Sequence, residues 1–253
     1  MAKAALIDIS KCMGCRGCQV ACKQWNGRQA VTTKNTGGYE NPPALSASTW
    51  TRVEFYEGYG QWSFRKHQCM HCTEASCEAV CPSGAISHSG EVVLIDQQKC
   101  VGCGYCVVAC PFDAVHRDDP RGTAQKCWFC FDRVSNGLTP ACAKTCPPKA
   151  ILFGDREEML AMGSKRVQEL LAAGTARANL YGEREVGGTA WLYVLPDRPS
   201  LFGLPDRPQV ATTNLIANWL GGVITAGVVT VLPFWLLFRR RQELEKEKSA
   251  KRD

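Results

Sequence analysis

Histidine is scarce in this sequence, and cysteine is absent from its C-terminal part. The chain has 4 histidines in 253 residues, and none of them lies in the long apolar stretch that begins at Leu215. A b-type haem in a membrane needs histidine ligands, so we expect any such haem to belong to another subunit. No cysteine follows Cys146, which confines thiol chemistry to the preceding part of the chain.

Several other signatures are also missing. The sequence contains no glycine-rich nucleotide loop, no pterin-binding signature and no recognisable nucleophile–base pair, so we do not expect the chain to be an enzyme by itself. The net charge of +6 is modest and much of it follows residue 238, so we expect no nucleic-acid partner. The first ten residues hold no apolar segment typical of a signal peptide, which argues against a secreted disulfide scaffold.

Cysteine, in contrast, is abundant in the part of the chain that ends at Cys146. The sequence has 16 cysteines, and they fall into four groups of four. The groups are Cys12, Cys15, Cys18 and Cys22; Cys69, Cys72, Cys77 and Cys81; Cys100, Cys103, Cys106 and Cys110; and Cys127, Cys130, Cys142 and Cys146. The first and third groups share the spacing C-x2-C-x2-C-x3-C. Proline directly follows the last cysteine of the second, third and fourth groups, at Pro82, Pro111 and Pro147.

This pattern is typical of [4Fe–4S] binding. Two residues between cysteines let one tight turn present successive thiolates to different irons, and the fourth cysteine begins a helix directed towards a second cluster. The trailing proline turns the chain away from the cluster. Four all-thiolate zinc sites would also use every cysteine, but zinc explains neither the repeated spacing nor the prolines. A zinc-stabilised membrane adaptor is the alternative from another class of protein.

Some charged or titratable side chains lie close to these cysteines in the sequence. They are Lys11, Arg16, Lys99, Lys126 and His71. Each basic side chain could alter the charge around a cluster or could lie on the solvent-exposed surface. We expect the surface position for each of them. His71 lies between two cysteines of the second group. Because cysteines already fill every site, we expect this histidine not to be a ligand.

An internal repeat precedes the first and third groups. Leu6-Ile7-Asp8 leads to Cys12, and Leu94-Ile95-Asp96 leads to Cys100 over the same number of residues. Each copy predicts a short strand followed by a metal-binding turn, so we expect two related modules. The predicted fold class is α+β, with two ferredoxin-like 2[4Fe–4S] modules and one C-terminal transmembrane helix.

Hydrophobic periodicity predicts further elements. Residues 50–56, 91–96 and 191–195 have the composition of strands. Asp155-x-x-Glu158 resembles a capping box and begins a helical pattern that stops before Gly174. The domains expected are a cluster domain at 1–154, with module A at 1–23 and 120–154, module B at 66–119 and an insertion at 24–65; a packing segment at 155–210; a transmembrane helix at 211–238; and a charged tail at 239–253.

The apolar stretch is long enough to cross a membrane. Residues 208–238 contain no charged side chain, and the part from Leu215 to Phe238 would rise about 36 Å as a helix, against a hydrocarbon core of about 30 Å. Arginines at 239–241 follow it, and the positive-inside rule places them in the cytoplasm. We therefore expect a single-pass protein of the cell membrane, with its cluster domain on the periplasmic or outer side.

The chain resembles the four-cluster electron-transfer subunits of molybdopterin and tungstopterin oxidoreductases, in particular the beta subunits of membrane-bound formate dehydrogenases. The resemblance is carried by the order of the four cysteine groups, by Trp25-Asn26 directly after the first group, by the segment from Gly187 to Leu201 and by the C-terminal helix. It implies four [4Fe–4S] clusters whose ligands cross between groups. The implied sets are Cys12, Cys15, Cys18 and Cys146 (cluster 1); Cys22, Cys127, Cys130 and Cys142 (cluster 2); Cys69, Cys72, Cys77 and Cys110 (cluster 3); and Cys81, Cys100, Cys103 and Cys106 (cluster 4).

The resemblance also implies a role in anaerobic respiration. Electrons from formate would reach this subunit from a molybdopterin or tungstopterin catalytic alpha subunit and leave it for a haem b membrane gamma subunit with quinone. The heterotrimer would be the unit of any higher oligomer. The same arrangement also suits another respiratory oxidoreductase, such as a membrane [NiFe] hydrogenase or a polysulfide-type reductase.

Overall fold

The computed structural model describes residues 2–34, 37–58, 61–118, 122–213 and 215–250. Its contacts divide the chain into two units, Met1–Val210 and Ala211–Asp253. The predicted packing segment 155–210 belongs to the first unit, together with the predicted cluster domain 1–154. The reason is a long-range pairing, because a strand at 191–195 hydrogen-bonds to the N-terminal strand.

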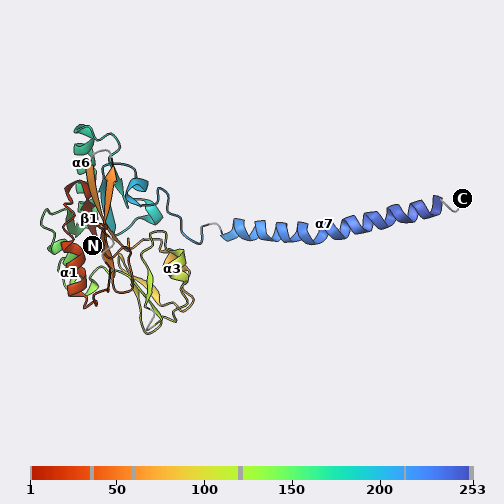
Figure 1. The fold of residues 1–253 in the computed structure, drawn as a ribbon, viewed down its shortest axis with the longest axis horizontal. Helices are drawn as coiled ribbons and strands as arrows, with labels where there is room; N and C mark the ends of the chain where they lie inside the picture. Colours follow the sequence, from red (N-terminus) through yellow and green to blue (C-terminus); the bar gives the residue numbers. More distant parts are fainter. Residues whose placement is uncertain (1, 35–36, 59–60, 119–121, 214, 251–253) are drawn as a thin grey trace. The chain divides into compact units, whose positions relative to one another are not determined.

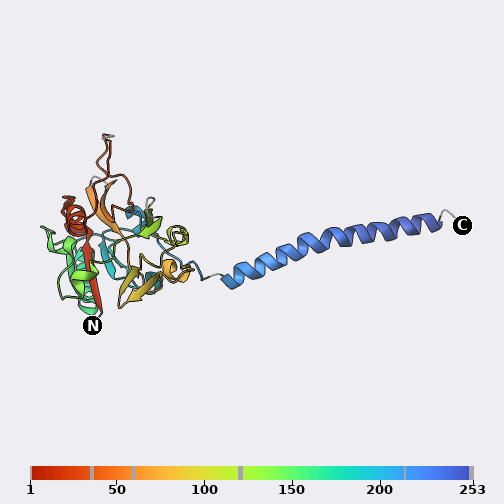
Figure 2. The same cartoon turned by 90° about the horizontal axis from the view of Figure 1, so that it is seen from below.

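A four-stranded sheet lies at the centre of the first unit (Figures 1 and 2). The strand β1 (Lys3–Asp8), red beside the N-terminus in Figure 2, pairs antiparallel with β8 (Ile151–Asp155) and parallel with β10 (Trp191–Leu195). β9 (Asn179–Tyr181) pairs antiparallel with β10. All five residues of β10 are buried and apolar, as expected for a strand covered on both faces. The strands predicted around Leu6 and at 191–195 are confirmed.

Alternation along these strands divides the core between the two faces of the sheet. Ala4, Leu6 and Leu192 contact the helix α6 (Arg156–Ala172), which covers one face (Figure 1). The neighbouring residues Ile7 and Trp191 point into the larger core on the other face, where the cysteine-bearing segments lie. The predicted helix after Asp155 is therefore confirmed. Its capping box is not, because the Asp155 carboxylate makes no capping bond and instead accepts from Lys3 Nζ at 2.8 Å.

Three two-stranded hairpins complete the strands of the first unit. They are β2 (Thr51–Gly58) with β3 (Gln61–Gln68), β4 (Ile86–Ser89) with β5 (Val92–Ile95), and β6 (His116–Asp118) with β7 (Thr123–Gln125). β2 and β5 confirm the strands predicted at 50–56 and 91–96. β3 has no apolar alternation because its buried side chains include Arg65, Lys66 and Gln68. The periodicity of the sequence therefore did not predict it.

Short helices follow or carry the cysteines. They are η1 (Ile9–Lys11), α1 (Gly17–Trp25), α2 (Ser76–Ala79), α3 (Tyr105–Ala109), α4 (Phe131–Val134) and α5 (Ala141–Lys144), with η2 (Glu185–Gly187) and η3 (Pro199–Phe202) later in the chain. α2, α3 and α5 each end before a Cys-Pro pair, as a proline that cannot continue a helix requires. α1 packs against α5, and α2 packs against α3.

The second unit consists of the helix α7 (Leu215–Ala250). Within its segment Trp219–Leu244, an 18-residue window has a mean hydropathy of 2.0 and is not buried, so the helix is long and apolar enough to cross a membrane. The helix is not the predicted 211–238. Residues 211–213 form a turn, and residue 214 lies outside the described residues. At the other end Arg239 and Arg240 pair with Glu243 along the helix, which continues to Ala250. Of the predicted tail, residues 251–253 lie outside the described residues.

Candidate metal centres

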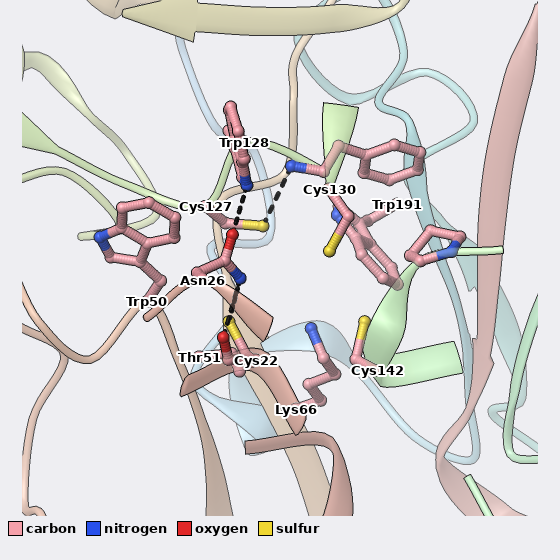
Figure 3. Close-up of a pocket in the computed structure, with 12 residues that line it drawn as sticks. Cys22, Asn26, Trp50, Thr51, Lys66, Cys127, Trp128, Cys130, Cys142 and Trp191 are labelled. Carbon is pink, nitrogen blue, oxygen red and sulfur yellow. Dashed lines mark hydrogen bonds between the residues drawn. The ribbon is translucent and has the colours of Figure 1, made fainter. Parts of the chain in front are cut away.

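Four thiols from distant parts of the sequence line one cavity in the first unit (Figure 3). Cys22 lies in α1, Cys127 and Cys130 lie before α4, and Cys142 lies in α5. They meet because α1 packs against α5 and because all four side chains belong to buried residues. The space left between them is small, about 10 Å³, and among the described residues no three of these thiols lie close enough to hold a single metal ion.

Aromatic and amide side chains form much of the remaining wall. Trp50, Trp128 and Trp191 line the cavity, and an aromatic wall of this kind excludes water. The Trp128 indole N–H donates to Asn26 Oδ1 at 2.5 Å, and Asn26 Nδ2 in turn approaches Cys22 Sγ at 3.7 Å. The Trp25-Asn26 pair that marks the sequence resemblance thus has a structural role. Asn26 at the C-terminus of α1 is oriented towards the sulfur of a candidate ligand.

The remaining thiols have thiol neighbours as well. Burial raises the pKa of Cys12, and the nearby thiols of Cys146 and Cys15 raise it further. Two other thiols behave in the same way: after burial, the pKa of Cys72 is raised by Cys69, Cys110 and Cys77, and that of Cys106 by Cys100, Cys103 and Cys81. For each of these three thiols, the thiols that raise its pKa belong to the same implied ligand set. The full sets remain predictions.

Burial changes the acidity of several of these thiols. It raises the pKa of Cys18, Cys22 and Cys77 to about 12, and that of Cys106 and Cys130 to about 11. Without metal these thiols are therefore protonated at neutral pH. Iron binds the thiolate, so cluster assembly has to displace these protons. The donor set is made of soft sulfur ligands in an apolar surrounding, and it fits an iron–sulfur cluster.

The metal-binding turns depend on left-handed backbone conformations. Gly14 and Gly102 occupy equivalent positions of the repeat with φ of 66° and 69°. The residue after the second cysteine is also left-handed in both copies, Arg16 at 61° and Gly104 at 82°. Such turns expose backbone N–H groups to sulfur, as the donation from Phe129 N to Cys127 Sγ at 3.4 Å shows.

The geometry does not suit the zinc alternative. Among the described residues, no three His, Cys, Asp or Glu side chains lie close enough to hold a single metal ion. A structural zinc requires four ligands at about 2.0–2.3 Å from one centre. Thiols that surround a cavity instead suit a polyatomic cluster, whose irons each take one thiolate.

Of the residues near the cysteines, Lys126 differs from expectation. Lys126 was expected in solvent but is 4% exposed, and its Nζ donates to the carbonyl oxygens of Val93 and Cys127. His71 is buried and its Nδ1 accepts from Val93 N at 3.1 Å, so this nitrogen is not available to a metal. Lys11 and Lys99 are exposed as expected.

Sequence reasoning missed Lys66 altogether. This residue of β3 is 2% exposed, and its side chain lines the cavity of Figure 3. Burial alone lowers the pKa of Lys66, but the charges of Cys142 and Cys127 outweigh it and leave the pKa above the usual range. The one signal in the sequence was indirect. A strand that pairs with residues 50–56 would have to follow them in the sequence. Every second residue of that strand would then face the cysteines.

Comparison with known proteins gives two family matches. Models of the 4Fe-4S dicluster domain match residues 11–85 and residues 60–156. The two matches together span all four cysteine groups.

Three curated relatives are similar over most of the chain. The formate dehydrogenase-O iron-sulfur subunit of Escherichia coli is 42% identical over 227 residues, which cover 86% of this chain and 75% of the relative. The formate dehydrogenase iron-sulfur subunit of Haemophilus influenzae is 44% identical, with coverage of 82% and 70%. The formate dehydrogenase subunit beta of Megalodesulfovibrio gigas is 40% identical, with coverage of 68% and 86%.

Proposed function

Because this chain belongs to the family of formate dehydrogenase iron–sulfur subunits, we propose that it carries electrons through four [4Fe–4S] clusters, from a molybdopterin or tungstopterin catalytic subunit to a haem b membrane subunit and quinone. The observation that carries the proposal is the cavity lined by Cys22, Cys127, Cys130 and Cys142. These four residues are one complete ligand set implied by the sequence resemblance. A bound cluster supplies one-electron chemistry, and the protein supplies the thiolates, the apolar walls and the N–H donors.

The proposed order of the four ligand sets rests on pairs of neighbouring thiols that belong to different sets. Three pairs of thiols link consecutive sets, and in each pair a charge on one thiol raises the pKa of the other, in addition to the larger effect of burial. The pairs are Cys18 with Cys142, Cys127 with Cys69, and Cys77 with Cys106. They support a linear order of clusters 1, 2, 3 and 4 along the first unit.

The two ends of this order reach the surface. Cys15 of set 1 and Cys103 of set 4 are exposed. Apolar side chains beside them are exposed as well: Met13 is 58% exposed, Val101 69% and Val108 89%. Exposed apolar surface next to a redox ligand suits contact with a partner protein. We assign the end at Cys15 to the catalytic subunit and the end at Cys103 to the membrane subunit, as the family resemblance implies.

α7 is the proposed membrane anchor. The hydroxyl of Thr225 donates to Gly221 O at 2.8 Å and that of Thr230 to Ala226 O at 2.8 Å, so these two polar groups are satisfied within the helix. By the positive-inside rule, the arginines after Phe238 support a cytoplasmic C-terminus, with the first unit on the periplasmic or outer side. In sealed spheroplasts, a C-terminal epitope tag is then protected from added protease; cleavage of the tag before lysis contradicts this orientation.

The function is tested in the complex purified anaerobically from membranes. Cys142→Ala removes one ligand of the cavity, so we expect the iron and acid-labile sulfide content to fall by one cluster. Formate-to-quinone activity is lost, while formate oxidation by a dye that accepts electrons from the catalytic subunit continues, because the proposed reaction centre lies in that subunit. Lys144→Ala, an exposed position of the same helix, is the matched control. Unchanged quinone reduction in the cysteine variant contradicts the proposal.

A further inference from the structure

Lys66 carries an amino group into the thiol-lined cavity. Its residue is 2% exposed, and Nζ lies 3.1 Å from Gln68 Oε1 and 4.3 Å from the centroid of the Trp191 ring. Figure 3 shows the amino group directed into the space between the sulfurs of Cys22 and Cys142. An amide oxygen and the face of an indole ring both favour the charged ammonium.

This ammonium has no acidic partner among the side chains that the structure describes. Within those ranges no carboxylate oxygen lies within 4.0 Å of Lys66 Nζ. An unpaired buried charge costs several kcal/mol, so a group of opposite charge is expected beside it. The thiolates of Cys22, Cys127, Cys130 and Cys142, together with the cluster that they hold, supply that negative charge.

From this arrangement we propose that Lys66 raises the reduction potential of the cluster held by the cavity. The inference rests on the proposed ligand sets. Reduction adds one negative charge, and a fixed positive charge in a low-dielectric surrounding stabilises the reduced state more than the oxidised state. Asn26 acts in the same direction, because its amide N–H approaches Cys22 Sγ at 3.7 Å.

The other lysines near cysteines are placed differently. Lys11 and Lys99 are exposed, and their Nζ atoms lie 3.8 Å and 3.7 Å from carboxylate oxygens of Asp8 and Asp96. Their charges are neutralised by these partners and screened by water. Lys126 is also buried, and two backbone carbonyl oxygens bind its Nζ; its charge lowers the pKa of Cys72, Cys77 and Cys110, which belong to set 3. Among these four lysines, only Lys66 lines the cavity.

The test is a redox titration of the intact complex followed by electron paramagnetic resonance. In Lys66→Met the signal of the cluster held by the cavity, which is the signal missing from Cys142→Ala, moves to a more negative potential. Its partner in module A moves less, because the charge of Lys66 also reaches Cys18, and the signals of module B do not move. Lys66→Arg retains the charge and keeps the wild-type potential. Lys99→Met removes an exposed lysine next to Cys100 and leaves all potentials unchanged.

The same samples separate this inference from the proposed function. Iron and sulfide analysis reports whether the clusters are present, whereas the titration reports their potentials. A Lys66→Met complex with full iron content and an unchanged potential for this cluster overturns the inference and leaves the proposed function intact. An equal shift of every signal overturns it too, because it indicates a general disturbance. If the methionine variant does not retain iron, Lys66→Gln, which is also neutral but can donate a hydrogen bond, is titrated and judged by the same outcomes.

Discussion

The two copies of the repeat place the same metal-binding turn in different surroundings. In the first copy the strand β1 lies between two other strands of a four-stranded sheet, and its residues from Ala4 onwards are buried. In the second copy β5 pairs with β4 in a two-stranded sheet, and its last two residues are half-buried. The turn itself hardly differs, since Gly14 and Gly102 have φ of 66° and 69°. The repeat therefore determines the turn, and tertiary packing determines its environment.

The helices after the two turns differ as well. α1 has nine residues and ends at Trp25, which is followed by the Asn26 that approaches a cysteine sulfur. α3 has five residues and ends directly before Cys110. The longer helix of the first copy brings polar and aromatic side chains to its neighbouring cavity, whereas the shorter α3 ends before it reaches a comparable position. The two modules should thus differ in stability and potential more than in the shape of their ligand turns.

The largest effect is expected from substitutions at the repeat glycines. A Cβ on Gly102 would lie 1.9 Å from the carbonyl oxygen of Gly122, a backbone atom that cannot move alone. A Cβ on Gly14 would lie 2.9 Å from the Phe64 ring, which is a side chain and can shift. Positive φ adds about 1–3 kcal/mol in both cases. We expect Gly102→Ala to lose one cluster and Gly14→Ala to retain its iron at reduced thermal stability.

Iron content per chain and the melting temperature of the purified complex measure this difference. Full iron content in Gly102→Ala would show that the backbone around Gly122 can move and that the two turns are equally tolerant. Loss of iron in both variants would place the constraint in the turn itself, not in what packs against it. Either result would break the comparison drawn from the surroundings of the two turns.

Elements with a clear apolar period could be predicted from the sequence. β1, β5, β10, α6 and the apolar part of α7 were all recognised in this way, and the cysteine spacing identified the type of cofactor. β3 could not be predicted, because its buried side chains are polar and their partners lie elsewhere in the chain. The pairing of the strand at 191–195 with the N-terminal strand could not be predicted for a related reason. Nothing in the sequence of β10 indicates that it pairs with β1, almost the whole chain away.

The candidate site was predicted in its ligands but not in its electrostatics. Cysteine groups are visible because iron requires thiolates at restricted spacings. The burial of Lys126 is not visible, since a lysine beside a cysteine is usually exposed. Its burial follows from the approach of the carbonyl oxygens of Val93 and Cys127. Polar groups that are buried because of long-range contacts are the part of such a site that requires a structure.

A smaller effect is expected from truncating matched strand residues. Ile7 is 1% exposed in β1, whereas Ile95, its equivalent in β5, is half-buried. Ile7→Ala should cost about 2–5 kcal/mol, as large-to-small substitutions in a closed core do. Ile95→Ala should cost less, because the shorter hairpin can close around the missing atoms and water reaches part of the side chain already. Thermal melting of the two purified complexes measures the difference, and equal losses would mean that β5 is buried against a partner subunit.

The smallest effect is expected at the aspartates that end the two repeat strands. Asp8 accepts from Ser10 N at 3.0 Å and pairs with Arg166 at 2.9 Å, and its side chain is 7% exposed. Asp96 accepts from Gln98 N at 2.9 Å but is exposed to solvent. Asp8→Ala should lower stability by about 1–3 kcal/mol, because it leaves buried donors without an acceptor. Asp96→Ala should change the melting temperature less, since water replaces the lost acceptor. Larger destabilisation by Asp96→Ala than by Asp8→Ala would reverse the comparison and show that the second turn depends more on its own local hydrogen bonds than the first.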